Sequence, residues 1–379
     1  MYNRKLLYFF IVAGAMLFLP GCKKSYEPAI LKSDNSFLVV NGFINISIEG
    51  NTTIQLSRTL KLTDTVTLIP ELNADVSVES ESGGIYPLHQ SGNDGTYISD
   101  QTTLSNSTKY RLNITTTNGN QYTSDFVECK QTPAIDSLTW KQDDGVTVFA
   151  NTHDPSNNSR YYRWSYSETW EYQSQLESIW GVGAGGVLYV TDSTTQVHVC
   201  WKNGESSNIV TGSSVALSQD VINAAPVAFL PSNDERINFR YSLLVKQYAL
   251  TADAYHYWQA IQKNSQELGT LFDPQPSQVN GNIHSTTNPG ELVIGFVSAT
   301  SQQESRLFIS NDQLTDWHTI PGGFSCPLDF TPNTFPYYTY SDESFAPYYF
   351  ITNGPLVITK KYCLDCRALG GYSQKPSFW

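Results

Sequence analysis

Hydrophobic and polar residues alternate along much of the chain after residue 35, and this period of two predicts half-buried β-strands. In the first run, Leu38, Val40 and Ile44 fall on one face, whereas Asn41 and Asn45 fall on the other. Similar runs recur at residues 54–60, 76–79, 85–88, 97–98, 110–115 and 122–127. About seven short strands separated by turns rich in Gly and Asn predict an immunoglobulin-like or fibronectin-like β-sandwich over residues 36–132.

A second domain is predicted to begin at residue 137, after a linker in which Pro133 interrupts the strand pattern. Alternation returns at residues 161–172, 187–190, 196–201, 238–250 and 292–297. A helical period appears between the last two runs, with Thr251 as its cap and Gly269 at its end. Its predicted inward stripe is Ala254, Tyr257, Trp258, Ile261, Ser265 and Leu268. The predicted fold class is mainly β, with the N-terminal sandwich followed by a larger β-rich domain over residues 137–379 that contains one main helix.

The most aromatic stretch lies in the predicted strand at residues 161–172, where Trp164 and Trp170 fall on the same side. An exposed aromatic face of this kind can stack on sugar rings or hold a peptide. The alternative, which we favour for this strand, is that this side is buried core, because any half-buried strand has a period-two apolar face. Trp180 follows in a loop-like stretch, where exposure is expected. The candidate ligand-binding residues are therefore Trp164, Trp170 and Trp180.

Residues 1–21 have the features of a bacterial secretory signal, with a basic start, an apolar run over residues 6–19 and a small residue before Cys22. The apolar run is too short to span a bilayer. A cysteine directly after the cleavage site predicts a lipoprotein whose lipid is attached to Cys22. Pro20 stands where a smaller residue is commoner, and the alternative is a plain signal peptide followed by a chance cysteine. Residues 22–35 are polar and predict a tether.

Charge and composition narrow the classes of partner. The chain carries 23 basic and 35 acidic residues, and the predicted signal contains two of the basic ones. The resulting net charge of about −14 argues against nucleic acid or anionic lipid headgroups as partners. Aromatic residues make up 13% of the chain and charged residues 15%, which is typical of an exported β-rich protein.

Cysteine content indicates disulfides in an exported chain. Five cysteines follow Cys22: Cys129, Cys200, Cys326, Cys363 and Cys366. An odd number leaves one free thiol. The spacing of Cys363 and Cys366 predicts a local disulfide, and the alternative of a redox pair lacks the strand-then-helix setting of thioredoxins. We expect the second bridge between Cys200 and Cys326. No second Cys or His cluster has the spacing of a zinc site, so no metal and no cofactor are predicted.

The sequence contains no H-E-x-x-H, no G-x-S-x-G, no P-loop and no EF-hand loop. Residues 181–186 match G-x-G-x-x-G, but a strand follows them where the dinucleotide fingerprint needs a helix, so a hairpin loop is predicted. The acid pairs Asp143–Asp144 and Asp234–Glu235 have the composition of a glycosidase site, but nothing in the sequence sets a carboxylate separation. We predict that the protein is not an enzyme and has no catalytic residues.

Several segments of the second domain carry a resemblance to a known family. They are residues 254–258, 269–276, 281–283 and 292–296, together with the C-x-x-C tail that runs to Trp379. These segments resemble the DUF4249 family of Bacteroidota lipoproteins, and the resemblance extends over nearly all of the chain after the signal. It implies an outer-membrane lipoprotein often encoded beside a TonB-dependent receptor. It implies no activity and no catalytic residues.

Three functional hypotheses follow from these observations. The first is a non-catalytic accessory or ligand-binding partner of a TonB-dependent transporter, lipid-anchored in the outer membrane. The cell surface is favoured over the periplasmic face as its location. The second is an adhesin or an envelope-structural lipoprotein. The third is a glycan or peptide hydrolase, which requires two carboxylates in a cleft, or a nucleophile and a base within reach of each other.

Overall fold

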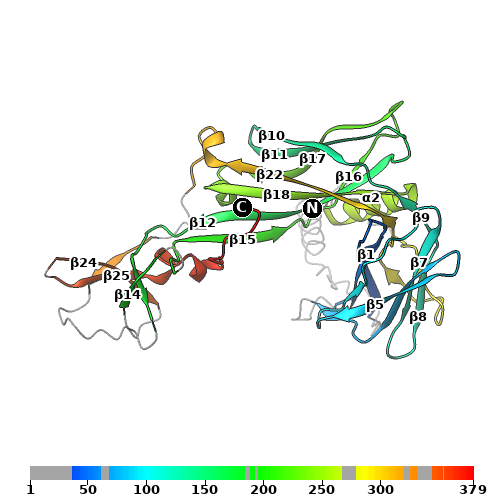
Figure 1. The fold of residues 1–379 in the computed structure, drawn as a ribbon, viewed down its shortest axis with the longest axis horizontal. Coiled ribbons are helices and arrows are strands. Elements are labelled where there is room, and N and C mark those ends of the chain that lie inside the picture. The colour runs from blue at the N-terminus through cyan, green and yellow to red at the C-terminus, as the bar shows by residue number, and fades with distance from the viewer. Residues whose placement is uncertain are drawn as a thin grey trace, which may run out of the picture. The chain divides into compact units, whose positions relative to one another are not determined.

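The structure is a computed structural model, and it describes residues 36–60, 68–183, 188–192, 195–266, 279–319, 325–330, 344–352 and 354–379. The predicted signal peptide, the tether and Cys22 lie outside these residues. The prediction of a mainly β fold is confirmed, because several sheets and one α-helix make up the regular structure of the described residues (Figure 1). None of the helices described is long and apolar enough to cross a membrane.

The first part of the chain forms a closed β-sheet. Its strands from this part are β1 (Leu38–Asn45), β2 (Thr53–Arg58), β3 (Ile69–Pro70), β4 (Asp75–Ser80), β5 (Ile85–Ser91), β6 (Thr96–Ser99), β7 (Lys109–Thr115), β8 (Gln121–Ser124) and β9 (Val127–Lys130). The order along the sheet is β19-β8-β7-β4-β5-β6-β2-β1-β21-β9, and β7 also pairs with β9. The ladder therefore closes on itself as a barrel, whereas the predicted sandwich has two separate sheets.

The barrel is completed by strands from much later in the chain. They are β19 (Ile283–Ser285), β20 (Val293–Ile294) and β21 (Ala299–Thr300), which pair with β8, with β1, and with both β1 and β9. The Asn282 side chain holds this segment, because it donates to the Val297 carbonyl at 2.9 Å and accepts from the Val297 amide at 2.8 Å. Sequence patterning assigns these residues to the second domain, whereas the structure places them in the first sheet.

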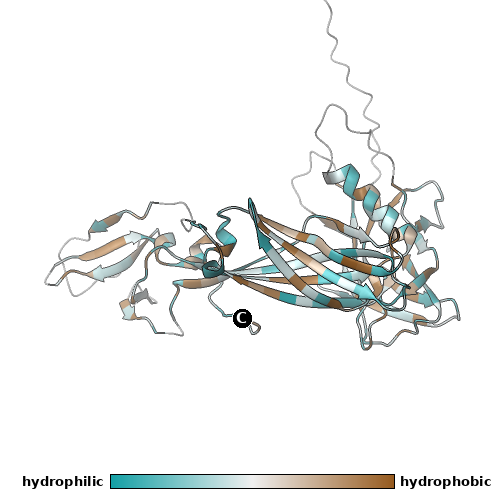
Figure 2. Ribbon diagram, turned by 90° about the horizontal axis from the view of Figure 1, so that it is seen from above, coloured by the Kyte–Doolittle hydropathy of each residue, from teal (hydrophilic) through white to brown (hydrophobic). Residues whose placement is uncertain are grey.

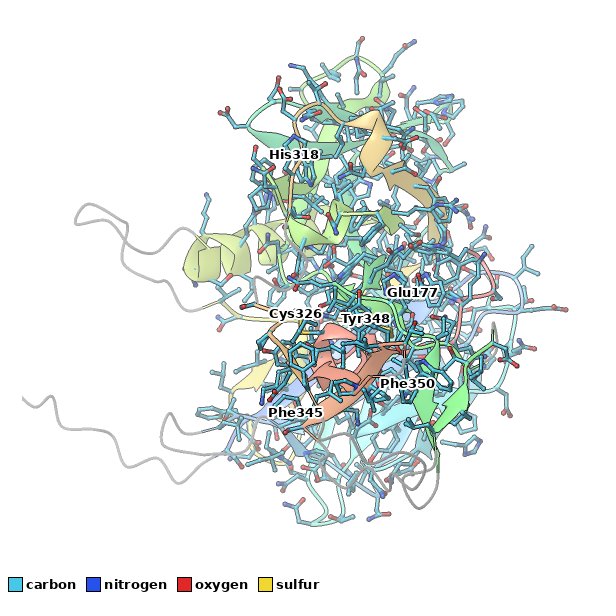
Figure 3. All side chains as sticks on the ribbon, turned by 90° about the vertical axis from the view of Figure 1, so that its left-hand side faces the viewer. Glu177, His318, Cys326, Phe345, Tyr348 and Phe350 are labelled. Atoms are coloured by element: carbon cyan, nitrogen blue, oxygen red, sulfur yellow. A yellow bond between two sulfur atoms is a disulfide. The ribbon has the colours of Figure 1, made fainter. Side chains whose placement is uncertain are left out.

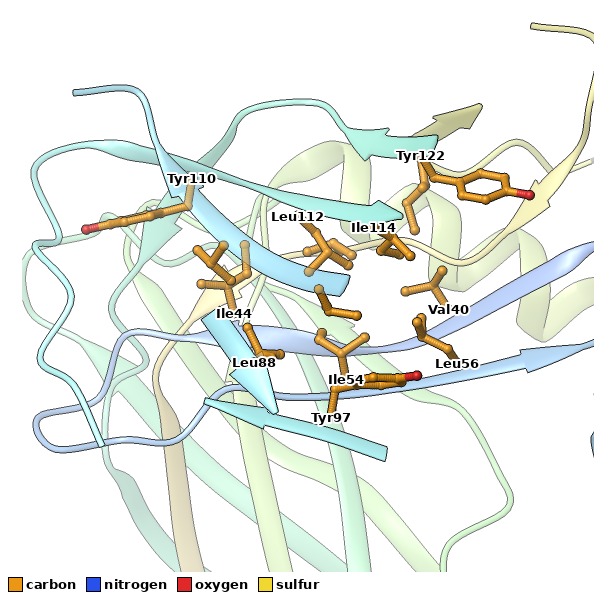
Figure 4. Close-up of a cluster of buried hydrophobic side chains, with 14 of the residues drawn as sticks. Val40, Ile44, Ile54, Leu56, Leu88, Tyr97, Tyr110, Leu112, Ile114 and Tyr122 are labelled. Atoms are coloured by element: carbon orange, nitrogen blue, oxygen red, sulfur yellow. The ribbon is translucent and has the colours of Figure 1, made fainter. Parts of the chain in front are cut away.

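The barrel encloses one hydrophobic core. The alternating residues of β1, β2 and β7 point inward, and Ile54, Leu56, Leu112 and Ile114 are at most 1% exposed (Figure 4). Tyr97 is also fully buried, but its hydroxyl donates to the Glu71 carbonyl at 2.9 Å, so its polar end is satisfied. Burial of each large apolar side chain stabilises the barrel by about 1.5–3 kcal/mol before entropy is considered.

Two further sheets pack face to face in the middle of the chain. One contains β10 (Ile135–Gln142), β11 (Gly145–Asp154) and β17 (Asp220–Pro231); the other contains β12 (Tyr161–Gln173), β15 (Val199–Glu205), β16 (Val210–Ser213), β18 (Arg240–Ala249) and β22 (Gln302–Ser310). Val148, Leu230, Trp164 and Leu243 from the two sheets share one buried cluster. Hydrophobic and hydrophilic residues alternate along these long strands (Figure 2), so each sheet turns one face to this core. The short helices η2 (Glu235–Ile237) and η3 (Asn311–Gln313) flank β18 and β22.

The predicted helix is present as α2 (Ala252–Gln266). Thr251 caps it as expected, because its hydroxyl oxygen accepts a hydrogen bond from the Ala254 amide at 3.3 Å. Ala254 and Tyr257 of the predicted stripe are buried, and Trp258 packs under the Arg163 guanidinium, 3.9 Å from its ring centre. The predicted last residues of the helix, Leu268 and Gly269, lie outside the described part of the chain.

A small module completes the described structure and is called the disulfide module below. It contains β13 (Trp180–Val182), β14 (Leu188–Val190), β23 (Leu328–Phe330), β24 (Phe345–Phe350), β25 (Leu356–Lys360), η5 (Lys361–Cys363) and η6 (Cys366–Leu369). β13 pairs with β14, and β23 and β24 flank β25. Figure 1 shows β14, β24 and β25 beyond the ends of β12 and β15.

One disulfide lies within this module, and another links it to β15 of the two sheets that pack face to face. Their pairing corrects the sequence prediction. Cys200 on β15 is bonded to Cys366, and Cys326 is bonded to Cys363, with Cα atoms 5.8 Å apart in each pair. The predicted Cys363–Cys366 and Cys200–Cys326 bridges were therefore wrong. Cys363 and Cys366 lie in separate short helices, and each bonds to a cysteine brought close by the tertiary fold. Cys129 has the free thiol that the odd number predicted.

Candidate ligand-binding site

The structure separates the three candidate tryptophans. Trp164 is 1% exposed, and its ring nitrogen donates to Gln247 Oε1 at 2.8 Å. It lies in the sandwich core, which is the alternative that the period-two pattern allowed. Trp170 is partly buried against the same core. Neither residue lines any of the cavities described below, so the ligand-binding interpretation fails for Trp164 and gains no support for Trp170.

Trp180 lies in a different environment, at the start of β13 in the disulfide module. It is partly exposed, and its ring meets Phe350 edge to face with ring centres 5.0 Å apart. Figure 3 looks onto this end of the molecule and shows Phe345, Tyr348 and Phe350 along β24, with Cys326 beside them. Contact with β24 fixes the orientation of the indole.

A cavity of about 260 Å³ opens between the β13–β14 hairpin, β24 and the η5–η6 segment. Its lining combines aromatic, hydroxyl and charged side chains: Ser178, Trp180, Gly181, Tyr189, Thr191, Thr195, Val197, Phe345, Ala346, Pro347, Lys361, Leu364, Asp365 and Arg367. Aromatic walls with a few convergent polar groups are typical of small-molecule sites. Of the three tryptophans proposed from the sequence, Trp180 is the one in such a setting.

Gly181 explains how an aromatic ring can lie across the hairpin. Gly181 and Tyr189 are opposite one another in the β13–β14 register. A Cβ atom on residue 181 would come within 2.4 Å of the Tyr189 ring carbon Cζ. The glycine therefore lets the Tyr189 ring cover the backbone of β13, on the face opposite to the Trp180 side chain. The hairpin itself confirms the rejection of a dinucleotide fingerprint at residues 181–186, because β14 follows where that fingerprint needs a helix.

The charged side of the cavity is formed by Asp365 and Arg367. The Asp365 side chain is 8% exposed, and it accepts hydrogen bonds from Arg367 Nε and Nη2 at 2.9 Å. The Arg367 side chain is 52% exposed. The hydrogen bond that Arg367 donates to Asp365, opposed by partial burial, raises the pKa of Arg367 above its ordinary value. The pair is thus a fixed cation at the rim, held by a buried carboxylate.

The disulfides hold the two sides of the cavity together. Cys366 lies between Asp365 and Arg367 in sequence, and its bond to Cys200 attaches this segment to β15. Ser178 attaches the hairpin to the opposite wall, because its hydroxyl donates to the Pro347 carbonyl at 2.8 Å. The walls are therefore fixed before any ligand arrives, which lowers the entropic cost of binding.

The family to which the chain belongs is shown by a match that covers most of its length. Residues 23–306 match the family described as a domain of unknown function, DUF4249. The chain belongs to the DUF4249 family. A comparison with curated proteins finds no match for this chain.

The residues of this DUF4249 protein that match the family include only part of the cavity lining. Trp180 and Tyr189 lie within the matched residues, whereas Phe345, Asp365 and Arg367 lie beyond residue 306. The resemblance noted in the C-terminal tail is therefore not part of this match. The hairpin wall belongs to the region shared with the family, and the charged wall comes from the rest of the chain.

A larger cavity, of about 810 Å³, lies between α2, β9 and residues 279–282 of the DUF4249 protein. Its aromatic residues already have partners in the protein: Tyr257 packs on Phe296 at 5.2 Å between ring centres, and Phe126 lies under Arg111 at 4.6 Å. None of the tryptophans proposed from the sequence lines it. We therefore favour the smaller cavity as the candidate site.

The acid pairs that the hydrolase hypothesis needs have other contacts. Asp234 accepts hydrogen bonds from Arg236 Nε at 3.0 Å and Nη2 at 2.7 Å. Burial raises the pKa of Asp234, but these bonds outweigh burial and bring that pKa below its usual value, which does not suit a general acid. Asp143 lies 2.9 Å from Lys141 in an exposed turn. Within the described residues, no group of three His, Cys, Asp or Glu side chains could hold a metal ion.

Sequence reasoning found Trp180 but missed Tyr189, Asp365 and Arg367. Tyr189 lies in the second strand of the β13–β14 hairpin, opposite Gly181. A broad ring opposite a glycine is a usable signal for a flat aromatic surface. Arg367 directly follows the second cysteine of the C-x-x-C motif, and Asp365 precedes that cysteine. An acid and a base on either side of a disulfide cysteine could have been recognised as a fixed ion pair.

Proposed function

We propose that this protein is a non-catalytic outer-membrane lipoprotein that captures a small ligand and passes it to a TonB-dependent transporter. Attachment by a lipid on Cys22 is supported by the sequence around the cleavage site. Ligand capture is supported by the cavity in the disulfide module, and this is the observation on which the proposal depends most. The acidic balance of the chain agrees with small molecules rather than nucleic acid as partners.

The cavity favours capture over chemistry for two reasons. Its one carboxylate, on Asp365, is engaged by Arg367, so it is not a free base. The hydroxyls of Ser178 and Thr195 donate to acceptors of the protein, at 2.8 Å to the Pro347 carbonyl and at 2.9 Å to Asp192 Oδ1. A nucleophile needs a base within hydrogen-bond reach, and the described contacts of Ser178 do not include one. Thr195 does contact a carboxylate, but Asp192 Oδ1 also accepts from the Thr195 amide at 2.9 Å and the Asp192 amide donates to the Thr195 hydroxyl at 2.9 Å, which is the pattern of a local turn.

Co-purification tests the transporter partnership. The full chain, with its signal and Cys22, would be expressed with a C-terminal affinity tag and extracted from outer membranes in a mild detergent. We expect a TonB-dependent transporter among the co-purified proteins identified by mass spectrometry. The Cys22→Ser variant is the matched control, and it should leave the membrane fraction and lose the transporter. Recovery of the lipidated protein without any transporter would overturn the proposal.

An adhesin is the second candidate, and it is favoured by apolar side chains on the surface of the disulfide module. Val190, Phe330 and Ile179 are 63%, 58% and 60% exposed. Exposed apolar residues of this kind can contact another surface. This candidate predicts attachment defects in a deletion strain with unchanged uptake, whereas ligand capture predicts reduced uptake at low ligand concentration.

A further inference from the structure

The local charge of the cavity is opposite to that of the protein. The chain has a formal net charge of −12, yet the cavity lining contains Lys361 and Arg367 and a single acid, Asp365. The Asp365 carboxylate is 8% exposed and is paired with Arg367, so it presents little negative charge to a ligand. The lining therefore carries an excess of positive charge, which attracts an anion.

The guanidinium of Arg367 is oriented so that one end remains available. Nε and Nη2 donate to Asp365, at 2.9 Å each, and the Arg367 amide donates to the same carboxylate at 3.0 Å. No hydrogen bond from Nη1 is found among the described residues. A buried carboxylate thus fixes the plane of the guanidinium, and Nη1 can donate to an oxygen of a ligand.

The serine and threonine hydroxyls of the lining are already used within the protein. Ser178 donates to the Pro347 carbonyl at 2.8 Å, and Thr195 donates to Asp192 Oδ1 at 2.9 Å. Thr191 donates to the Ser178 carbonyl at 3.4 Å. A ligand that needs hydrogen-bond donors will find them on the cationic side chains, which bind charged acceptors more strongly than neutral ones.

The aromatic wall specifies the other half of the ligand. Tyr189 is 41% exposed and lies over Gly181, whereas the Trp180 ring packs on Phe350. Broad rings of this kind pack against the apolar C–H face of a sugar ring. The volume of about 260 Å³ lies just below the usual range of ligand sites, so it suits one ring rather than a long chain.

We propose that the cavity binds one sugar ring that carries a carboxylate, that is, a uronate residue of an acidic glycan. The ring stacks on Tyr189, and the carboxylate accepts hydrogen bonds from Arg367 Nη1 and the Lys361 ammonium group. This assignment rests on the proposed function, since it names the ligand class of the same cavity.

Calorimetric titration of the purified full chain tests the assignment with two matched probes. The first is an oligogalacturonate, and the second is the same oligosaccharide after reduction of its carboxyl groups. We expect the acidic probe to bind at least about tenfold more tightly, because hydrogen bonds between charged groups are stronger than those between neutral groups. Its affinity should also fall as salt is raised, since both cations are partly solvated.

Substitutions of Lys361 and Arg367 test whether these side chains cause the preference for the acidic probe. Lys361→Gln changes an exposed side chain, so it should weaken the acidic probe severalfold without unfolding the module, and it should leave the neutral probe unchanged. Arg367→Gln should weaken the acidic probe at least about tenfold. Because Arg367→Gln leaves Asp365 unpaired, its thermal unfolding would be measured, and Arg367→Lys would be tested for partial rescue. Lys141→Gln, with a side chain 68% exposed and far from the lining residues in sequence, is the control.

The outcomes separate this inference from the proposed function. Equal binding of both probes, with loss in Tyr189→Ala, overturns the uronate assignment and leaves ligand capture standing. Failure of the acidic probe to bind also overturns the assignment. If neutral sugars of a wider panel then bind in a Tyr189-dependent way, capture stands. If nothing binds and no transporter co-purifies, the proposed function fails as well.

Discussion

The closed barrel and the disulfide module are stabilised in different ways. The barrel has a single large core of inward side chains, including Leu38, Ile54 and Leu112, each fully buried, and it has no disulfide among its described residues. The disulfide module has short strands, a cavity of about 260 Å³ and both of the disulfides found in the described chain. A region too small to bury much apolar surface needs covalent links to stay folded. The module can therefore keep a cavity open that a well-packed core would fill.

Breaking the disulfides is expected to give the largest effect and to affect the two regions unequally. The Cys200–Cys366 bond spans 166 residues and the Cys326–Cys363 bond spans 37, so the first restricts the unfolded chain more. We expect Cys200→Ser/Cys366→Ser to lower the free energy of unfolding of the module by about 2–5 kcal/mol. Hydrogen exchange should show loss of protection in β23 to β25 while the barrel strands stay protected.

A comparable loss in the barrel would contradict this division. The double variant Cys326→Ser/Cys363→Ser provides the matched comparison, and its effect should be smaller because the closed loop is shorter.

A cavity-creating substitution in the barrel is expected to destabilise the barrel and to leave the disulfide module unaffected. Leu112 is fully buried, so Leu112→Ala should lower the free energy of unfolding of the barrel by about 2–5 kcal/mol. Ligand affinity at the disulfide module should not change. Ile85 is 69% exposed in the same barrel, and Ile85→Ala should cost less than about 0.5 kcal/mol. Similar chemical denaturation curves for the two variants would argue against the core assigned here.

Gly181→Ala tests the geometry of the aromatic wall with a smaller effect. The new Cβ would lie 2.4 Å from Tyr189 Cζ, so the ring must move away from β13. We expect weaker ligand binding, with a change in melting temperature of only a few degrees. The measurement is a calorimetric titration of the same ligand into the wild type and into the variant. Unchanged affinity would remove Tyr189 from the site.

The free thiol in the barrel is expected to give the smallest effect and contrasts with the paired cysteines of the module. Burial raises the pKa of Cys129 to about 11. The reactive thiolate is therefore scarce at neutral pH in the folded protein and becomes commoner as the pH rises toward that value. Labelling with iodoacetamide at pH 7.5, followed by peptide mass spectrometry, should modify Cys129 slowly until the protein is unfolded. Rapid native labelling would show that the thiol is more accessible than its packing indicates.

Local patterning predicted many elements of this fold, but it missed the sheet of β10, β11 and β17 as well as β22. The alternation of Leu38, Val40 and Ile44 gave β1, and the stripe of Ala254 and Tyr257 gave α2 with its Thr251 cap. These elements depend on residues close together in sequence, whose side chains repeat with the period of a strand or a helix.

Long-range contacts were not predictable in the same way. Ile283–Ser285 pairs with β8 and Ala299–Thr300 pairs with β1, although more than a hundred residues separate them, and nothing in a period-two pattern names a partner strand. The disulfide pairing failed for the same reason, because Cys363 and Cys366 are neighbours in sequence but bond to different strands or loops. The charged half of the candidate site, Asp365 and Arg367, depends on that pairing and was missed with it.

Ligand capture at the disulfide module is tested most directly by a pair of tyrosine variants. Tyr189 lines the cavity and is 41% exposed, whereas Tyr349 belongs to the same module, is 42% exposed and does not line it. The full chain and both variants would be titrated with oligogalacturonate and a panel of neutral oligosaccharides. We predict a ligand that the wild type and Tyr349→Ala bind alike and that Tyr189→Ala binds at least about tenfold more weakly. Equal binding by Tyr189→Ala and Tyr349→Ala would contradict the account.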